Sequence, residues 1–82
     1  YSPFTMKIHT YAVLKDYFDK EFTIDERVGT VEGLHNFLAQ RNPAAVTILA
    51  ASRYAVKDNF VGDDFVLNTE DTIHIMPPSS GG

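Results

Sequence analysis

The chain closes with the stretch TIHIMPPSSGG (residues 72–82), in which alternating polar and apolar residues run directly into proline, serine and glycine. The alternation predicts a strand whose two isoleucines face the core, while its threonine, histidine and methionine face the other way. Pro77 and Pro78 fix φ and favour an extended stalk. The two final glycines have no Cβ, so they are able to enter a narrow slot. We therefore predict a rigid strand that carries a stalk and a flexible tip.

The segments upstream of this strand predict further short strands around one main helix. The helix begins after Thr30 as its N-cap and ends at Asn42-Pro43. Residues at three- and four-residue steps form its apolar stripe, namely Val31, Leu34, Phe37 and Leu38. The remaining pattern predicts strands over 6–13, 21–25, 53–57, 65–67 and 72–76, turns over 58–59, 62–64 and 68–71, a helical turn over 14–20 and a short second helix over 44–51.

This order of elements predicts an α+β fold in two layers, with one main helix packed across a mixed sheet of four to five strands. We interpret residues 1–5 as an addition that precedes the natural chain, because the first strand begins at Met6. Residues 6–76 then form the domain, and residues 77–82 form an extended tail. The ending Ser-Ser-Gly-Gly is also typical of a flexible linker or a cloning remnant, so the tail alone does not decide its own role.

The composition excludes several classes of function. The chain has 82 residues, no cysteine and a net charge of −4, so a disulfide framework, a cysteine-ligated metal and a cysteine nucleophile are excluded. Its lysines and arginines are scattered singly, whereas nucleic-acid binding needs clustered positive charge. No apolar run is long enough to span a membrane. We expect neither nucleic acid nor a membrane as a partner, and a basic groove on a partner protein suits the charge better.

Self-contained catalytic and metal sites are not indicated by the remaining polar residues. His9 and His74 are expected on neighbouring strands of one face, but no third or fourth ligand is evident and zinc takes four, so no metal site is assigned. His35 is expected to be exposed to solvent. The acidic pairs Asp63-Asp64 and Glu70-Asp71 are interpreted as solvated turn residues. No serine has an evident histidine and aspartate partner set.

Several segments of the chain together resemble one known family. They are Tyr11-Ala12, Thr30-Val31-Glu32-Gly33-Leu34, Tyr54-Ala55-Val56, Glu70-Asp71 and the strand 73–76 with its tail Pro77-Pro78-Ser79-Ser80-Gly81-Gly82. The pattern is similar to the small subunit of molybdopterin synthase (the MoaD family), a ubiquitin-like β-grasp sulfur carrier. The chain departs from that family at Lys57 and Ser79, where asparagine and valine are usual, and in the turn 70–72, which lacks the usual glycine.

The resemblance implies a specific chemistry for the tail. An activating enzyme would use ATP to adenylate the carboxylate of Gly82, and a sulfur donor would then convert it to a thiocarboxylate, with Gly81 giving clearance. The chain would bind no cofactor and would not be an enzyme on its own. Its partner would be the large catalytic subunit of molybdopterin synthase, in a cytoplasmic heterotetramer that transfers sulfur to a pterin precursor and builds the dithiolene of the molybdenum cofactor.

The resemblance also implies which residues contact the partner. The stalk would consist of Met76, Pro77, Pro78, Ser79 and Ser80, and the family's hydrophobic docking patch maps onto Tyr11, Phe60 and Met76. For Phe60, burial in the core beneath a turn is an equally good interpretation. Three other functions stay open: a thiocarboxylate carrier for thiazole, cysteine or tRNA thiolation, a ubiquitin-like modifier of lysines, and an interaction module with a non-functional tail.

Overall fold

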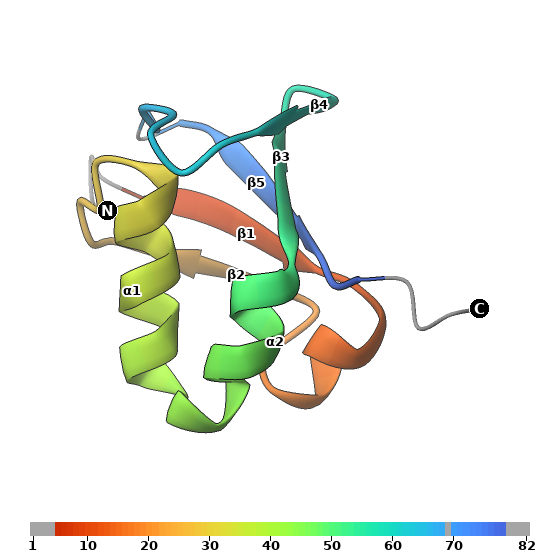
Figure 1. Ribbon diagram of the computed structural model, residues 1–82. Helices are drawn as coiled ribbons and strands as arrows, with labels where there is room; N and C mark the ends of the chain where they lie inside the picture. The colour runs from red at the N-terminus through yellow and green to blue at the C-terminus, as the bar shows by residue number, and fades with distance from the viewer. Residues whose placement is uncertain (1–4, 69, 79–82) are drawn as a thin grey trace.

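Five short segments with alternating apolar residues form one mixed sheet. The computed structural model describes residues 5–68 and 70–78. Its strands are β1 (Met6–Thr10), β2 (Glu21–Ile24), β3 (Arg53–Val56), β4 (Asn59–Val61) and β5 (Thr72–Met76). They lie in the order β2-β1-β5-β3-β4 (Figure 1). Only β1 and β5 are parallel neighbours, and the other pairs are antiparallel.

The strand that leads to the tail, β5, lies at the centre of this sheet. Ile73 is paired with Ile8 of β1, and Ile75 is paired with Tyr54 of β3. Both isoleucines of β5 are fully buried, whereas its other side chains are half-buried on the opposite face. The predicted orientation of this strand is therefore confirmed. Because β5 is held on both sides, the base of the tail has a fixed direction.

Two helices cover one face of the sheet. They are α1 (Val31–Arg41) and α2 (Val46–Ala51), joined by the 3₁₀ turn η2 (Pro43–Ala45), and a second 3₁₀ turn, η1 (Ala12–Asp16), follows β1 (Figure 1). The Thr30 hydroxyl accepts a hydrogen bond from the Gly33 N–H at 3.2 Å, which confirms the predicted N-cap. Leu34 and Leu38 are buried against the sheet. The predicted α+β fold in two layers is confirmed.

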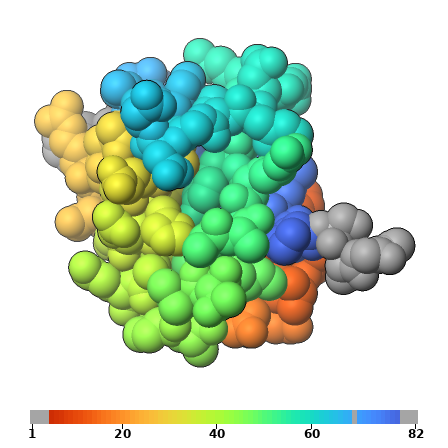
Figure 2. Space-filling view, viewed as in Figure 1, coloured from red at the N-terminus to blue at the C-terminus, as the bar shows by residue number. Residues whose placement is uncertain are grey.

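The strand predicted over residues 65–67 is wrong, because this segment is used to cap α1. The Val31 N–H donates to the Phe65 carbonyl at 3.1 Å, and the Glu32 N–H donates to the Asp63 carbonyl at 2.9 Å. These are two of the N–H groups that have no partner within a helix. Only an isolated bridge, between Thr30 and Val66, pairs the segment with extended chain. In Figure 2 this segment lies over the end of α1.

Three strand ends and one turn also differ from the prediction, since β2 and β3 each end one residue earlier than predicted. β1 ends at Thr10, and Ala12 begins η1 with a positive φ of 52°. The hairpin turn consists of Lys57 and Asp58, both with positive φ, instead of residues 58–59. Two consecutive residues with positive φ are the geometry that a two-residue hairpin prefers. Within the described ranges, no helix is long and apolar enough to cross a membrane.

The acidic turn before β5 is only partly as predicted. Glu70 is exposed, but Asp71 is buried, and its carboxylate accepts a hydrogen bond from the Asn68 N–H at 2.8 Å. Asp71 is therefore a turn residue, as expected, although it is not solvated. Its side chain closes the turn that feeds the chain into the central strand.

Candidate functional site

The face of the sheet opposite the helices is the candidate site. One row of paired residues crosses all five strands on this face, and it consists of Glu21, His9, His74, Ala55 and Phe60. Their side chains share a face because each residue lies directly opposite its neighbour in the register. We call this surface the open face. It is continuous with the end of β5, and hence with the base of the tail.

A tyrosine and two histidines form an aromatic cluster on the open face. Tyr11 continues β1 with extended backbone (φ −132°, ψ 156°), so its side chain lies on the same side as His9. Its hydroxyl is 2.7 Å from Nδ1 of His74. The rings of His9 and His74 are stacked with centroids 5.0 Å apart. The predicted placement of both histidines on neighbouring strands is therefore confirmed. No group of three or more potential metal-ligating side chains occurs within residues 5–68 and 70–78.

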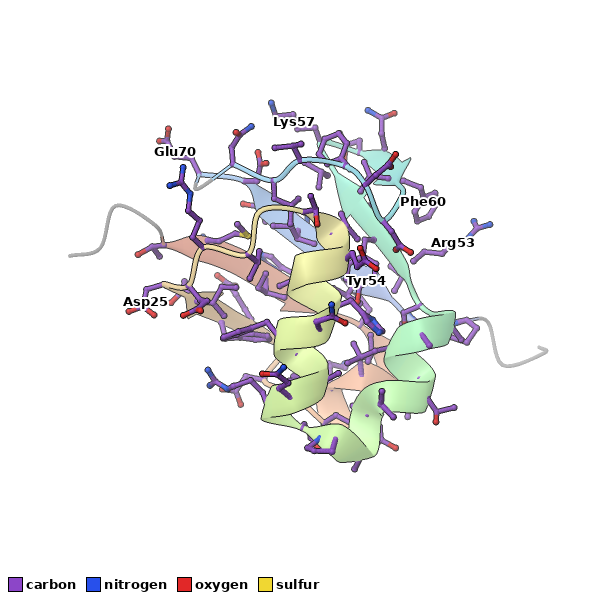
Figure 3. All side chains as sticks on the ribbon, turned by 60° about the vertical axis from the view of Figure 1, so that its left-hand side comes forward. Asp25, Arg53, Tyr54, Lys57, Phe60 and Glu70 are labelled. Atoms are coloured by element: carbon purple, nitrogen blue, oxygen red, sulfur yellow. The ribbon has the colours of Figure 1, made fainter. Side chains whose placement is uncertain are left out.

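An arginine and a phenylalanine extend the open face toward the far edge of the sheet. The Arg53 guanidinium lies 5.0 Å from the centroid of the Phe60 ring, and both side chains point outward in Figure 3. Phe60 is 57% exposed, so it does not belong to the core. Arg53 is paired with Met76, which is half-buried at the end of β5. The three residues of the predicted docking patch thus share one face, and Arg53 lies between Met76 and Phe60.

The stalk begins at the end of the open face where Tyr11 and Arg53 lie. Pro77 is half-buried and Pro78 is exposed. The predicted stalk residues Ser79 and Ser80, and the predicted reacting residues Gly81 and Gly82, lie outside the described residues. What the structure adds is the position of the base of the tail beside the aromatic cluster.

The charge on the open face differs from that of the whole chain. Among the strand residues that face this way, Lys7 and Arg53 are cationic and Glu21 is anionic. Lys7 and Glu21 form an ion pair at 3.5 Å with both side chains half-exposed, and such a pair contributes little to stability. The acidic excess of the chain is therefore located elsewhere. The exposed large aromatic side chains on this face are Tyr11 and Phe60.

A second tyrosine–histidine pair lies on the helical side of the sheet. The Tyr54 hydroxyl is 3.3 Å from Nδ1 of His35, and in Figure 3 Tyr54 lies close to α1. Burial, followed by the nearby Asp63 carboxylate, raises the pKa of Tyr54 well above its usual range. The prediction that His35 is solvent-exposed is wrong, since it is half-buried against the sheet. Its position beside Leu34 on the helix turns it partly toward β3.

Sequence reasoning missed one member of the open face. Arg53 was assigned no role, whereas His74 was expected on this face. The available signal was strand parity, because Arg53 and Ala55 alternate with the buried Tyr54 and Val56. Applied to β3 as it was to β5, parity places Arg53 on the face opposite to Tyr54, and the register then pairs it with Met76.

Comparison with known families gives one match that spans most of the chain. The model of the ThiS family matches residues 9–82. Among functionally curated proteins, none matches the chain. The matched range contains β1 from His9 onward, both helices and every later strand.

Several solved structures share the fold at low sequence identity. A candidate molybdopterin converting factor subunit 1 from Pyrococcus furiosus has a TM-score of 0.78 at 19% identity, covering 92% of this chain and 98% of that one. Small archaeal modifier protein 1 from Methanosarcina acetivorans has a TM-score of 0.76 at 21% identity, covering 95% and 96%. Subunit 1 in the complex of subunits 1 and 2 of the molybdopterin-converting factor from Helicobacter pylori has 0.67 at 18%, covering 95% and 99%. The fold is therefore the ubiquitin-like β-grasp.

Proposed function

Because the chain belongs to the ThiS family, we propose that it carries sulfur as a thiocarboxylate on Gly82. The observation that supports this most directly is the path of β5. The central strand, paired on both sides, leads into Pro77 and Pro78 and then into a sequence that ends in two glycines. A carboxylate at the end of such a tail would reach a partner's active site while the domain stays docked outside it.

The proposed chemistry takes place on the tail, and the catalytic groups belong to the partners. An activating enzyme uses ATP to adenylate the Gly82 carboxylate, which replaces a poor leaving group with AMP. A sulfur donor displaces AMP and leaves the thiocarboxylate. The chain itself binds no cofactor and supplies no acid or base to this step. Gly81, which has no side chain, lets the tip approach a buried reaction centre.

The open face is the proposed docking surface for these partners. Tyr11 and Phe60 are exposed aromatic residues on it, and Met76 joins the surface to the stalk. Aromatic residues, methionine and arginine are the residue types enriched in protein interfaces. Because Arg53 already stacks on Phe60, docking would bury a surface that is arranged in advance, and little ordering entropy would be lost.

The proposed pathway is molybdenum cofactor synthesis, with the large subunit of molybdopterin synthase as the receiving partner in a cytoplasmic heterotetramer. The Pro-Pro step before the Ser-Ser-Gly-Gly ending, shared with that branch of carriers, supports this choice. The fold is also found in a molybdopterin-converting factor complex, where that protein is paired with a second subunit. Transfer of two sulfur atoms to the pterin precursor would build the dithiolene.

The pathway is tested by reconstitution. The chain is mixed with the activating enzyme, ATP, a sulfur donor, the large subunit and the pterin precursor, and the dithiolene product is measured. We expect product with the full chain and none with a variant that lacks Gly82. The circular dichroism spectrum of that variant should match the spectrum of the full chain. Product formation by the deletion variant, or attachment of the chain to lysines instead of sulfur transfer, would contradict the proposal.

A further inference from the structure

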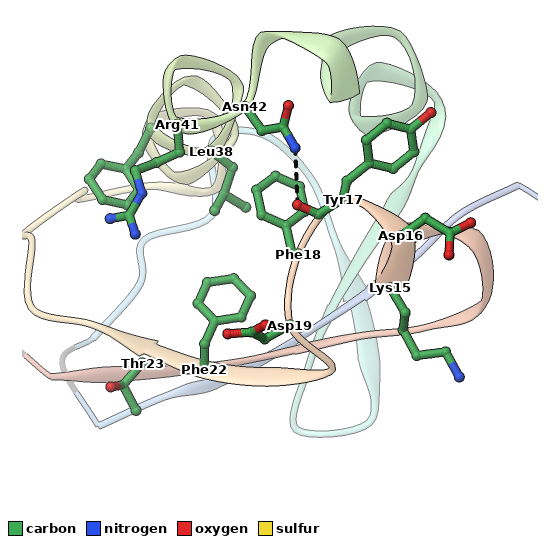
Figure 4. A pocket seen from close by; sticks show the side chains of 11 residues that line it. Lys15, Asp16, Tyr17, Phe18, Asp19, Phe22, Thr23, Leu38, Arg41 and Asn42 are labelled. Carbon is green, nitrogen blue, oxygen red and sulfur yellow. Dashed lines mark hydrogen bonds between the residues drawn. The ribbon is translucent and has the colours of Figure 1, made fainter.

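A groove beside the outer edge of β2 has no role in the proposed sulfur transfer. Its volume is about 750 Å³, and it lies between β2, the segment that precedes β2 and the C-terminal half of α1 (Figure 4). Phe18 and Phe22 line it with their rings stacked at 6.0 Å, and Leu38 also lines it. The two phenylalanines are partly buried and pack against the core. The groove therefore presents aromatic rings, among charged and polar side chains, next to a sheet edge.

The edge itself offers free backbone groups. Among the strands formed by residues 5–68 and 70–78, β2 is the last of the sheet and pairs only with β1. The Thr10 N–H donates to the Lys20 carbonyl at 2.9 Å, which makes these two residues a hydrogen-bonded pair. In an antiparallel ladder such pairs alternate, so Phe22 also turns its backbone toward β1 while Glu21 and Thr23 turn theirs outward. Within the described ranges, no backbone group pairs with these outward groups.

The rim of the groove carries charges of both signs. The Arg41 guanidinium lies 5.5 Å from the centroid of the Phe37 ring, and no carboxylate in the described part of the chain lies within ion-pair distance of it. Asp19, on the segment before β2, likewise has no cationic partner there. Figure 4 shows the two side chains at separate places around the stacked phenylalanines. A bound segment would therefore meet apolar groups at its centre and opposite charges at its ends.

We propose that the outer edge of β2 binds an extended segment of another protein as an added strand. Alternate apolar side chains of that segment fill the groove above Phe22, while its backbone pairs with the outward groups of Glu21 and Thr23. A carboxylate lies opposite Arg41, and a basic side chain lies opposite Asp19. A second copy of this chain fits less well. In the register centred on Thr23, Glu21 of each copy would face Asp25 of the other, and each copy has a net charge of −4.

The proposal is tested by titrating the ¹⁵N-labelled chain with two acetylated peptides, Asp-Val-Ile-Val-Lys and the reverse order Lys-Val-Ile-Val-Asp. Both orders are used because the direction of the added strand is not specified by the free groups. We expect saturable amide shifts in β2 and the C-terminal half of α1 with one of them. Deletion of Gly82 should leave these shifts unchanged, so the test does not depend on the sulfur-carrier proposal.

Two variants make the test specific. Thr23→Pro removes an outward N–H without removing a bond to β1, and proline is tolerated on edge strands. It should abolish the shifts, whereas the matched control Thr23→Val should keep them. Arg41→Glu should weaken binding about fivefold or more, since it exchanges an attraction for a repulsion. Replacing the aspartate of the bound peptide by lysine should then restore the affinity.

Several outcomes of the peptide titrations would overturn the proposal. The first two are the absence of shifts with both peptides and shifts that are confined to the open face. Another is equal peptide binding by a Thr23→Pro variant whose spectrum shows that it is folded. The last is failure of the charge exchange between Arg41 and the peptide to restore the affinity. Concentration-dependent shifts in β2 without peptide would also overturn it, since a second copy would then occupy the edge.

Discussion

In the described part of the chain, two tyrosine–histidine pairs lie on opposite faces of the same sheet, and one is partly buried while the other is exposed. Tyr54 is buried on the helical side, where its hydroxyl is near His35 and its pKa is raised. Tyr11 is 39% exposed on the open face, where its hydroxyl is near His74. The same pair of side chains therefore has a different role on each face. On the covered face they contribute to stability, and on the open face they are left at the surface beside the tail.

The largest difference between the two faces in the free energy of unfolding is expected for substitutions at neighbouring residues of β5. Ile75→Ala should lower the free energy of unfolding by about 2–5 kcal/mol, because a fully buried side chain is replaced by a cavity. Met76→Ala, one residue further on and half-buried, should cost clearly less. Urea unfolding of both variants measures this. Equal losses would show that the open face is also part of the core.

A second contrast concerns two glycines, Gly33 in the first turn of α1 and Gly62 in the exposed loop after β4. A Cβ on Gly33 would lie 2.0 Å from the Val28 carbonyl oxygen, which is backbone and has no rotamer to change. Gly33→Ala should therefore destabilise by about 1–3 kcal/mol despite the better helix propensity of alanine. Gly62→Ala meets only the Asp64 side chain, at 3.6 Å.

Thermal unfolding of the two glycine variants makes the comparison. We expect the melting temperature of Gly33→Ala to be clearly lower than that of the unchanged chain. The melting temperature of Gly62→Ala should be almost unchanged. A stabilised Gly33→Ala variant would mean that the packing of α1 on the segment before it is looser than described.

The two tyrosines themselves give the third contrast, which depends on pH. Tyr54→Phe should cost about 0.5–1.5 kcal/mol through the lost hydrogen bond, while Tyr11→Phe should cost less. Because the folded-state pKa of Tyr54 lies above the ordinary value of 10.0, its contribution is complete below that pH and is lost as the pH rises further.

Denaturant unfolding between neutral pH and pH 11 measures this loss. The wild-type chain and Tyr11→Phe should lose stability above pH 10 more steeply than Tyr54→Phe. If the free energy of unfolding fell equally steeply with pH in all three chains, Tyr54 would ionise as freely in the folded chain as in the unfolded one.

The smallest effect on stability is expected on the open face. Phe60→Ala should change the free energy of unfolding little, because the ring is 57% exposed. It should weaken binding to the activating enzyme or the large subunit by about 1 kcal/mol or more, as expected for an exposed aromatic anchor. Phe65→Ala, which removes a ring in the α1-capping segment, is the control. Calorimetric titration that shows equal losses for both would remove Phe60 from the docking surface.

Much of this arrangement follows from local sequence patterns. The alternation in β5 placed its isoleucines correctly because strand parity is strict, and the N-cap at Thr30 is a local hydrogen bond. Phe60 could not be assigned, because its face depends on the length of the hairpin turn, and one residue more or fewer turns its side chain to the other face. The positive φ of Lys57 and Asp58 sets that register, and neither residue type requires it.

Other features depend on contacts between distant segments. The segment around Phe65 has a strand-like sequence, yet its carbonyl groups are used by the first N–H groups of α1. The N–H groups that use these carbonyls belong to the start of α1, which is distant in the sequence. Local propensity therefore cannot predict this role of the segment. The groove beside β2 likewise exists only once α1 lies next to the edge strand. Gly81 and Gly82 were identified from the sequence of the tail and its resemblance to the MoaD family, and they lie outside the described residues.

The central claim is that Gly82 accepts sulfur, and the intact mass of the chain tests it most directly. The chain would be incubated with the activating enzyme, ATP and a sulfur donor, beside a variant that ends at Gly81. We predict a mass increase that corresponds to replacement of one oxygen by sulfur, in the full chain only. An unchanged mass with an activating enzyme that loads its own carrier, or an equal increase in the shortened chain, would contradict the account.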